Sequence, residues 1–201
     1  MAIKSLDRLL VINFTLVTEA LLLLMATFWS KSQNIRLAPL LVLHHKNLLI
    51  GIGAGLIMVA TSMLLIWIGK VADRLSPDKL RWLSSMRRII FEDLAPVFSQ
   101  LHVLDIFIIA AVSGFCEEVF FRGVMQDQLG LVWTSIIFGV FHGPSLRHLS
   151  YGLWAAASGA FLGWILQQTG CLWAPIIAHA LNNSISLLYI RYCIKPEVAT
   201  E

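Results

Sequence analysis

Residues 103–122 read VLDIFIIAAVSGFCEEVFFR, an apolar stretch that ends in two adjacent glutamates and an arginine. The apolar part predicts a membrane-embedded helix, where a carboxylate is costly and an acidic side chain is by default a hypothesis for a functional site. Neighbouring helix positions differ by about 100° in direction, so Glu117 and Glu118 face different surroundings. Glu118 and Arg122 are four residues apart and can pair as a structural support near the interface, which leaves Glu117 without a local cation.

The composition of the chain indicates a polytopic membrane protein. Of its 201 residues, 58% are hydrophobic and only 13% are charged, whereas a soluble domain carries about 25% charged residues. The length allows about six spans and leaves no room for a sizeable soluble domain. The net charge of +3 is small and no basic run is present, so nucleic acid is not an expected partner. We predict an all-α, multi-pass helical bundle in the cell (inner) membrane, with the lipid bilayer as its environment.

Six apolar segments divide the chain, at residues 9–29, 48–68, 103–121, 131–142, 150–168 and 172–190. The fourth segment would form about 18 Å of helix, too short to cross a hydrocarbon core of about 30 Å. It stops at His142-Gly143-Pro144, which breaks a helix. The expected units are two transmembrane helices in 1–70, a basic amphipathic interfacial segment in 71–102, a functional core in 103–190 and a tail in 191–201.

The distribution of basic residues predicts the orientation. With the N-terminus inside, eleven of the fifteen Lys and Arg residues lie on the inner side, six of them in residues 70–102. Cytoplasmic loops carry such an excess, so both termini are expected inside. This assignment places residues 122–130 and 169–172 outside.

Three further polar residues occur in the apolar stretches after Glu117. His142 follows Phe138 by one helical turn, and His179 and Asn183 are four residues apart on one helix face. An imidazole and an amide in this arrangement can donate hydrogen bonds to one oxygen atom. Counted from the face that carries residues 122–130 and 169–172, Glu117, His179 and His142 lie about 8, 10 and 16 Å deep. Their similar depth predicts one shared site.

Each residue also has a purely structural interpretation. A single histidine or asparagine in a membrane helix can serve as an interhelical hydrogen-bond donor. Glu19, in the middle of the first apolar segment, is interpreted as a paired contact inside the bundle. The combination of Glu117, His142, His179 and Asn183 at one depth favours a functional site over four separate packing contacts.

The three motifs Glu-Glu-x-x-x-Arg, Phe-x-x-x-His and His-x-x-x-Asn, in this order on apolar helices, resemble the CAAX prenyl protease and bacteriocin-processing family (Abi family) of intramembrane proteases. The resemblance covers about residues 103–190 and implies a protease core there. It implies a glutamate-dependent endopeptidase with Glu117, His142, His179 and Asn183 as catalytic residues. Glu118, Arg122 and Phe138 would support them.

The chemistry of peptide hydrolysis fits these residue types. Glu117 and His142 can polarise a water for attack on a peptide carbonyl, and His179 and Asn183 can donate to the oxyanion. No metal is expected, but Glu and two His can ligate zinc, so a metalloprotease variant is an open alternative. The substrate would be a membrane-associated or prenylated peptide, or a small peptide such as a bacteriocin leader.

Two other functional classes stay open at this point. A non-catalytic membrane scaffold or bacteriocin-immunity factor of the same family would use the same pocket for binding. A proton-coupled transporter is less favoured, because neither internal repeats nor a second acidic helix pair is visible. The charge count predicts a site that opens away from the cytoplasm, whereas the resemblance implies a site reached from the cytoplasm.

Overall fold

The computed structural model describes residues 7–75 and 80–194, and within these residues it contains helices and turns but no strand. The predicted all-α fold is confirmed. Six longer helices carry the bundle: α1 (Arg8–Ser32), α2 (His45–Leu75), α5 (Val103–Glu117), α6 (Gln126–His142), α7 (Leu149–Thr169) and α8 (Trp173–Cys193). The short elements are η1 (Ala38–Leu41), α3 (Arg81–Arg88), η2 (Ile89–Leu94), α4 (Ala95–Phe98), η3 (Glu118–Met125) and η4 (Leu146–His148).

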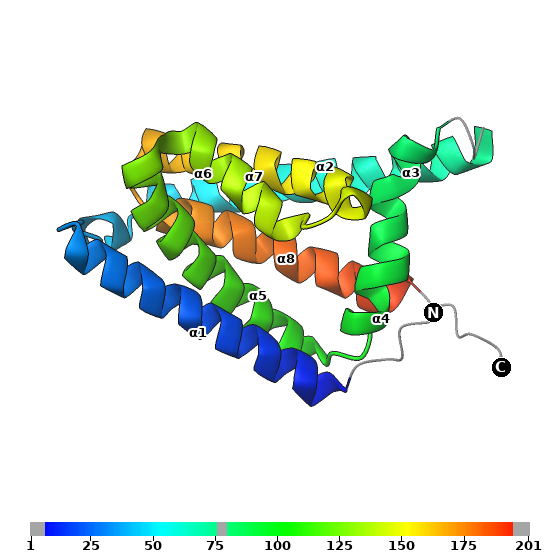
Figure 1. Cartoon of the computed structure of the whole chain (residues 1–201), viewed down its shortest axis with the longest axis horizontal. Helices are drawn as coiled ribbons and strands as arrows, with labels where there is room; N and C mark the ends of the chain where they lie inside the picture. Colours follow the sequence, from blue (N-terminus) through cyan, green and yellow to red (C-terminus); the bar gives the residue numbers. More distant parts are fainter. Residues whose placement is uncertain (1–6, 76–79, 195–201) are drawn as a thin grey trace.

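Helix α8 lies in the middle of the bundle and packs against α2, α5 and α7, while α1 lies beside α5 and α6 pairs with α7 (Figure 1). The chain alternates direction between two ends. One end carries the start of α1, the segment α3–η2–α4 and the end of α8, and the other carries η3 and the start of α8. The two ends of the described chain therefore lie at the same end of the bundle, as the charge count predicts.

Small residues allow α8 to approach its neighbours closely. A Cβ atom on Gly55 of α2 would lie 3.0 Å from the carbonyl oxygen of Ala178, and one on Gly114 of α5 would lie 3.0 Å from the backbone nitrogen of Ala180. Membrane helices associate through such small-residue contacts, because lipid supplies no hydrophobic drive between them. This packing holds α5 against the part of α8 that carries His179 and Asn183.

The chain from α5 to α6 changes helical form twice. Residues 118–125 form the π-helical segment η3, and Gly130 interrupts α6 with φ 75° and ψ 170°, a conformation that glycine adopts without strain. The regular part of α6 after this kink therefore covers the predicted short segment and ends at His142. The kink and the early end together set His142 inside the bundle.

Three helical stretches within the described residues are long and apolar enough to cross a membrane: Arg8–Ser32, His45–Leu75 and Leu146–Thr169. Large apolar side chains on these helices point outward, such as Phe28 and Leu153, which are 78% and 62% exposed. In a lipid environment this exposure is favourable. The six predicted apolar segments fall within helices except for Leu172, which precedes α8, and η3 follows α5 directly.

The basic segment after α2 forms the helical column α3–η2–α4, which stands at one end of the bundle (Figure 1). Its apolar side, with Met86, Ile90 and Ala95, is buried. On its polar side, Arg87 and Arg88 pair with Asp73 at the end of α2. The segment is amphipathic as predicted, and its placement at the membrane interface stays a prediction. Residues 1–6, 76–79 and 195–201, including most of the predicted tail and Lys4, Lys79 and Lys195, lie outside the described residues.

Candidate active site

The two adjacent glutamates face different surroundings, as the helix geometry predicts. Oε2 of Glu117 lies 3.7 Å from Nε2 of His142, and the Glu117 side chain is 12% exposed. Oε1 of Glu118 lies 2.9 Å from Nη1 of Arg122, and this side chain is fully buried. Helix α5 thus delivers one carboxylate to an accessible pair and the next to the interior.

The Glu118–Arg122 pair, which we expected to be a structural pair near the interface, is buried inside the protein. Its depth in the membrane stays a prediction. Both side chains are at most 1% exposed, and the rings of Phe138 and Phe121 lie 4.2 and 5.8 Å from the Arg122 guanidinium. Nδ1 of His179 also lies 2.8 Å from Oε1 of Glu118. Glu118 therefore holds both a cation and a predicted catalytic imidazole. Removing one member of a buried pair costs several kcal/mol, so we assign Glu118 and Arg122 to the framework of the site, which also orients His179.

Phe138 supports both halves of the site. Its ring lies 4.2 Å from the Arg122 guanidinium and 4.3 Å from the centre of the His142 ring. A guanidinium over an aromatic face is attracted by the ring quadrupole, which compensates part of the cost of burying Arg122. The backbone at Gly159 leaves room here, since a Cβ atom would lie 2.9 Å from Nη2 of Arg122.

The orientation of His142 follows from one hydrogen bond. Its Nδ1 lies 2.9 Å from the carbonyl oxygen of Phe138. A carbonyl only accepts, so Nδ1 carries the hydrogen and donates it. In the neutral ring Nε2 is then a free acceptor, and it is Nε2 that faces Glu117. The spacing of 3.7 Å exceeds a direct hydrogen bond but lies within the reach of one water molecule.

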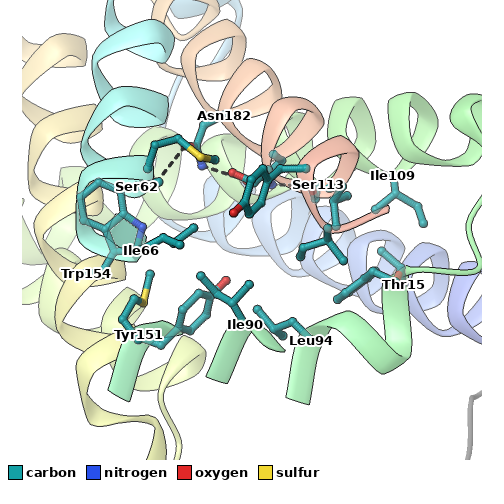
Figure 2. A pocket seen from close by; sticks show the side chains of 18 of the residues that line it. Thr15, Ser62, Ile66, Ile90, Leu94, Ile109, Ser113, Tyr151, Trp154 and Asn182 are labelled. Atoms are coloured by element: carbon teal, nitrogen blue, oxygen red, sulfur yellow. Dashed lines mark hydrogen bonds between the residues drawn. The ribbon is translucent and has the colours of Figure 1, made fainter. Parts of the chain in front are cut away.

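Asn183 is held by a chain of hydrogen bonds that crosses three helices. Its Nδ2 donates to Oγ of Ser113 at 3.2 Å, and its Oδ1 accepts from Asn182 at 3.4 Å. Ser62 of α2 donates to Oδ1 of Asn182 at 3.5 Å. Figure 2 shows this chain at the rim of a cavity. The sequence reasoning missed Ser62, Ser113 and Asn182, because a small polar residue in a membrane helix carries little signal by itself.

A cavity of about 240 Å³ lies directly beside the site. Glu117 and Asn183 line it together with Ser113 and Asn182. Figure 2 shows Ser113 and Asn182 in its wall. The rest of its wall is mainly apolar and includes Ile66, Ile90, Leu94, Phe98, Ile109 and Leu187. One polar region in an otherwise apolar cavity is typical of a binding site for an organic ligand.

A second, smaller cavity of about 40 Å³ lies next to the first. His142, His179 and Asn183 line it, and Tyr151, Trp154, Asn182 and Asn183 border both cavities. A polar space of this size can hold a water molecule. The four predicted residues therefore surround two adjoining cavities, Glu117 from the larger one and the two histidines from the smaller.

The larger cavity extends toward the end of the bundle that carries α3, η2 and α4. Met86, Ile90, Leu94 and Phe98 form its wall there. Toward the end that carries η3, buried apolar side chains fill the bundle. These are Phe120, Phe121, Val124 and Met125. The expectation that the site opens toward residues 122–130 was therefore wrong. Counting residues along a helix gives the depth of a side chain in the bundle. Side-chain packing decides where the bundle leaves an empty cavity.

Glu19 belongs to the site as well. We expected it to be a paired contact inside the bundle, and it is 5% exposed. It lines the larger cavity and contacts Glu117, so its neighbour is a second acid.

The metalloprotease alternative concerns a different feature of the site. Residues 7–75 and 80–194 contain no group of three or more His, Cys, Asp and Glu side chains arranged to hold an ion.

Comparison with known proteins identifies the segment that contains most of this site. Residues 99–185 match the family model described as type II CAAX prenyl endopeptidase Rce1-like. The chain is also 30% identical over 96 residues to a Bacillus subtilis (strain 168) protein named uncharacterized protein YpbD. That match covers 48% of this chain and 51% of the relative, so the chain spans about half the length of the curated relative that it matches. No solved structure matches the chain.

The matched segment contains all four predicted catalytic residues and their supports Glu118, Arg122 and Phe138. Glu19 and Ser62 lie before it and join the site through the fold. The resemblance read from three short motifs thus agrees with a comparison made over 87 residues. Over residues 99–185 the chain is similar to the Rce1-like family of type II CAAX prenyl endopeptidases.

Proposed function

We propose that the chain is an intramembrane endopeptidase in which Glu117 and His142 activate a water molecule. The observation that carries this proposal is the approach of Oε2 of Glu117 to Nε2 of His142, 3.7 Å apart beside an apolar cavity. A water between these atoms can donate one hydrogen to each acceptor. The donor bond from Nδ1 to Phe138 keeps Nε2 free for this task.

The reaction proceeds by addition and elimination. Glu117 takes a proton from the water while the water oxygen forms a bond to the peptide carbonyl carbon. The electron pair of the carbonyl moves to its oxygen. When the carbon–nitrogen bond breaks, this pair restores the carbonyl, and the leaving amine takes the proton from Glu117. A positioned general base contributes about 10²–10⁴-fold in rate.

His179 and Asn183 would stabilise the oxyanion. Nδ2 of Asn183 has two hydrogens and uses one toward Ser113, so the second is available. Glu118 accepts the hydrogen on Nδ1 of His179 and stabilises an imidazolium that donates from Nε2. Loss of one oxyanion donor lowers kcat by about 10²–10³-fold.

The membrane orientation follows from combining charge with the position of the cavity. The end of the bundle that carries α3–η2–α4 is rich in arginine. The arginines in the elements at or near this end are Arg74, Arg87, Arg88, Arg147 and Arg191. If this basic end faces the cytoplasm, the larger cavity lies in the cytoplasmic half of the bundle. The charge count and the family analogy then agree. The chain would be a multi-pass protein of the cell (inner) membrane with a site reached from the cytoplasm.

The proposed substrate is a membrane-associated peptide or a small peptide with an apolar segment. The wall of the larger cavity is mainly aliphatic and aromatic, and its polar lining includes Glu117, Ser113 and Asn183. An apolar side chain or a lipid group attached to the peptide would occupy the wall region, and the scissile bond would reach the polar region. Both a prenylated peptide and a bacteriocin leader satisfy this description.

The test uses the purified chain in detergent with a peptide library and mass-spectrometric detection of cleavage. Cleavage is expected for the wild type and not for Glu117→Ala. Asp127→Asn is the matched control, because Asp127 is an exposed acid at the far end of the bundle. Binding of peptides without cleavage by the folded wild type would instead identify a scaffold or immunity factor.

A further inference from the structure

The side chain of Glu19 has an unusual position for an acid in the middle of an apolar helix. It is 5% exposed and lines the larger cavity. Its Oε2 atom is buried and has no hydrogen-bond partner among the described residues. A carboxylate in this position would be costly, because burial without a paired cation removes its hydration.

Among the described residues, the basic group that acts on Glu19 is His179, and it is shared with another acid. Its ionisable neighbours are Glu117 and Cys116 on α5 and His179 on α8. His179 is already bound to Glu118, and Arg122 is paired with Glu118 as well. Two carboxylates in contact repel each other strongly in a medium of low polarity, so such a pair holds one proton.

We propose that Glu19 is a positioning residue that keeps this proton and donates it as a hydrogen bond to the ionised carboxylate of Glu117. The inference rests on the proposed peptidase function and deepens it. The proton belongs on Glu19 because Glu19 is the more buried of the two and Glu117 faces the His142 imidazole. The bond fixes the Glu117 carboxylate toward His142 and prevents like-charge repulsion in the empty site.

The proposal distinguishes between substitutions of similar size. Glutamine at position 19 keeps a neutral side chain with a hydrogen-bond donor, so it imitates a protonated glutamate. Leucine is apolar and suits a membrane helix, but it donates no hydrogen bond. A merely structural role would be served equally well by leucine, whereas a positioning role would not.

The experiment compares Glu19→Gln and Glu19→Leu with Thr18→Val, a control on the lipid-exposed side of the same helix. We expect Glu19→Leu to lower kcat by about ten- to a hundredfold, the effect of one lost hydrogen bond to a charged group, with KM and Tm nearly unchanged. Glu19→Gln and Thr18→Val should stay within about threefold of the wild type. Unchanged kcat in Glu19→Leu overturns the proposal. A loss in Glu19→Gln as large as in Glu117→Gln also overturns it, because Glu19 would then itself transfer protons.

An infrared spectrum gives a readout that does not depend on peptidase activity. The wild type at neutral pH should show the carbonyl stretching band of a protonated carboxyl group, and Glu19→Gln should lack it. Persistence of the band in Glu19→Gln would overturn the inference even if the enzyme is active. If the wild type cleaves no peptide but the band behaves as expected, the proposed peptidase function fails while the shared proton stands.

Discussion

Nε2 of His142 and Oε2 of Glu117 face each other across 3.7 Å, with the other ring nitrogen of His142 bound to the carbonyl oxygen of Phe138. The distance leaves the two acceptors without a direct bond, and Oε2 of Glu117 is buried without a hydrogen-bond partner among the described residues, so a shared water would satisfy both. This relationship separates Glu117 from its neighbour Glu118, whose Oε1 atom contacts both Arg122 and His179. The consequences for mutants differ accordingly.

The two glutamates should respond differently to the same substitution. Glu117→Gln is expected to abolish cleavage with little change in Tm, because it removes a proton acceptor and leaves no cation without a partner. Glu118→Gln should lower the free energy of unfolding by about 3–5 kcal/mol, because Arg122 then lies buried without a full counter-charge. Thermal melts in detergent, with cleavage assays on the same preparations, measure both effects. Equal losses of activity and stability in the two variants would contradict the assignment.

Replacing His142 by a shorter side chain separates the tasks of its two ring nitrogens. In His142→Asn the amide nitrogen can replace Nδ1 and donate to the carbonyl oxygen of Phe138, but no atom replaces Nε2. We expect kcat to fall by about 10²–10⁴-fold while the fold is kept. Circular dichroism and Tm serve as the control for folding. Nearly full activity in this variant would mean that Nε2 takes no part in activating water.

Removal of metal ions tests the mechanism that needs no cofactor. If Glu117 and His142 activate the water directly, cleavage should persist after treatment with EDTA or phenanthroline. The rate with and without chelator, measured at saturating substrate, gives the answer. Loss of activity with phenanthroline, followed by recovery on addition of zinc, would instead establish the metalloprotease alternative.

Single cysteines report the orientation in the membrane. The background variant has Cys116→Ala, Cys171→Ala and Cys193→Ala, and the probes are Gln128→Cys in α6 and Leu75→Cys at the end of α2, both exposed positions at opposite ends of the bundle. A membrane-impermeant reagent applied to intact cells should label Gln128→Cys only. Leu75→Cys should react after permeabilisation. The reverse pattern would place the larger cavity in the outer half of the bundle.

The sequence predicts those parts of the site that depend on helix periodicity. It predicts that Glu117 and Glu118 diverge, that Glu118 can reach Arg122, and that the helix with His142 ends there. The pairing of Glu118 with Arg122 survives even though the segment is π-helical, because the two residues still lie about one turn apart. Counting along the helices grouped Glu117, His142 and His179, and the structure places these residues around two adjoining cavities.

Contacts between helices were not predictable in the same way. His179 lies 61 residues after Glu118, and nothing in either local pattern indicates that they meet. Glu19 was placed inside the bundle correctly, but its approach to Glu117 depends on how α1 lies along α5. The position of the larger cavity depends on which end of the bundle large side chains fill, and the packing of Phe120 and Phe121 decides that.

The aromatic ring of Phe138 joins two groups with different tasks. One of its neighbours is Arg122, which belongs to the buried ion pair, and another is His142, which belongs to the accessible pair. Free-energy effects of substitutions that share a neighbour are generally not additive. A change at Arg122 will therefore alter the effect of a change at His142, although the two side chains do not need to touch. One ring thus links the buried ion pair to the proposed catalytic pair.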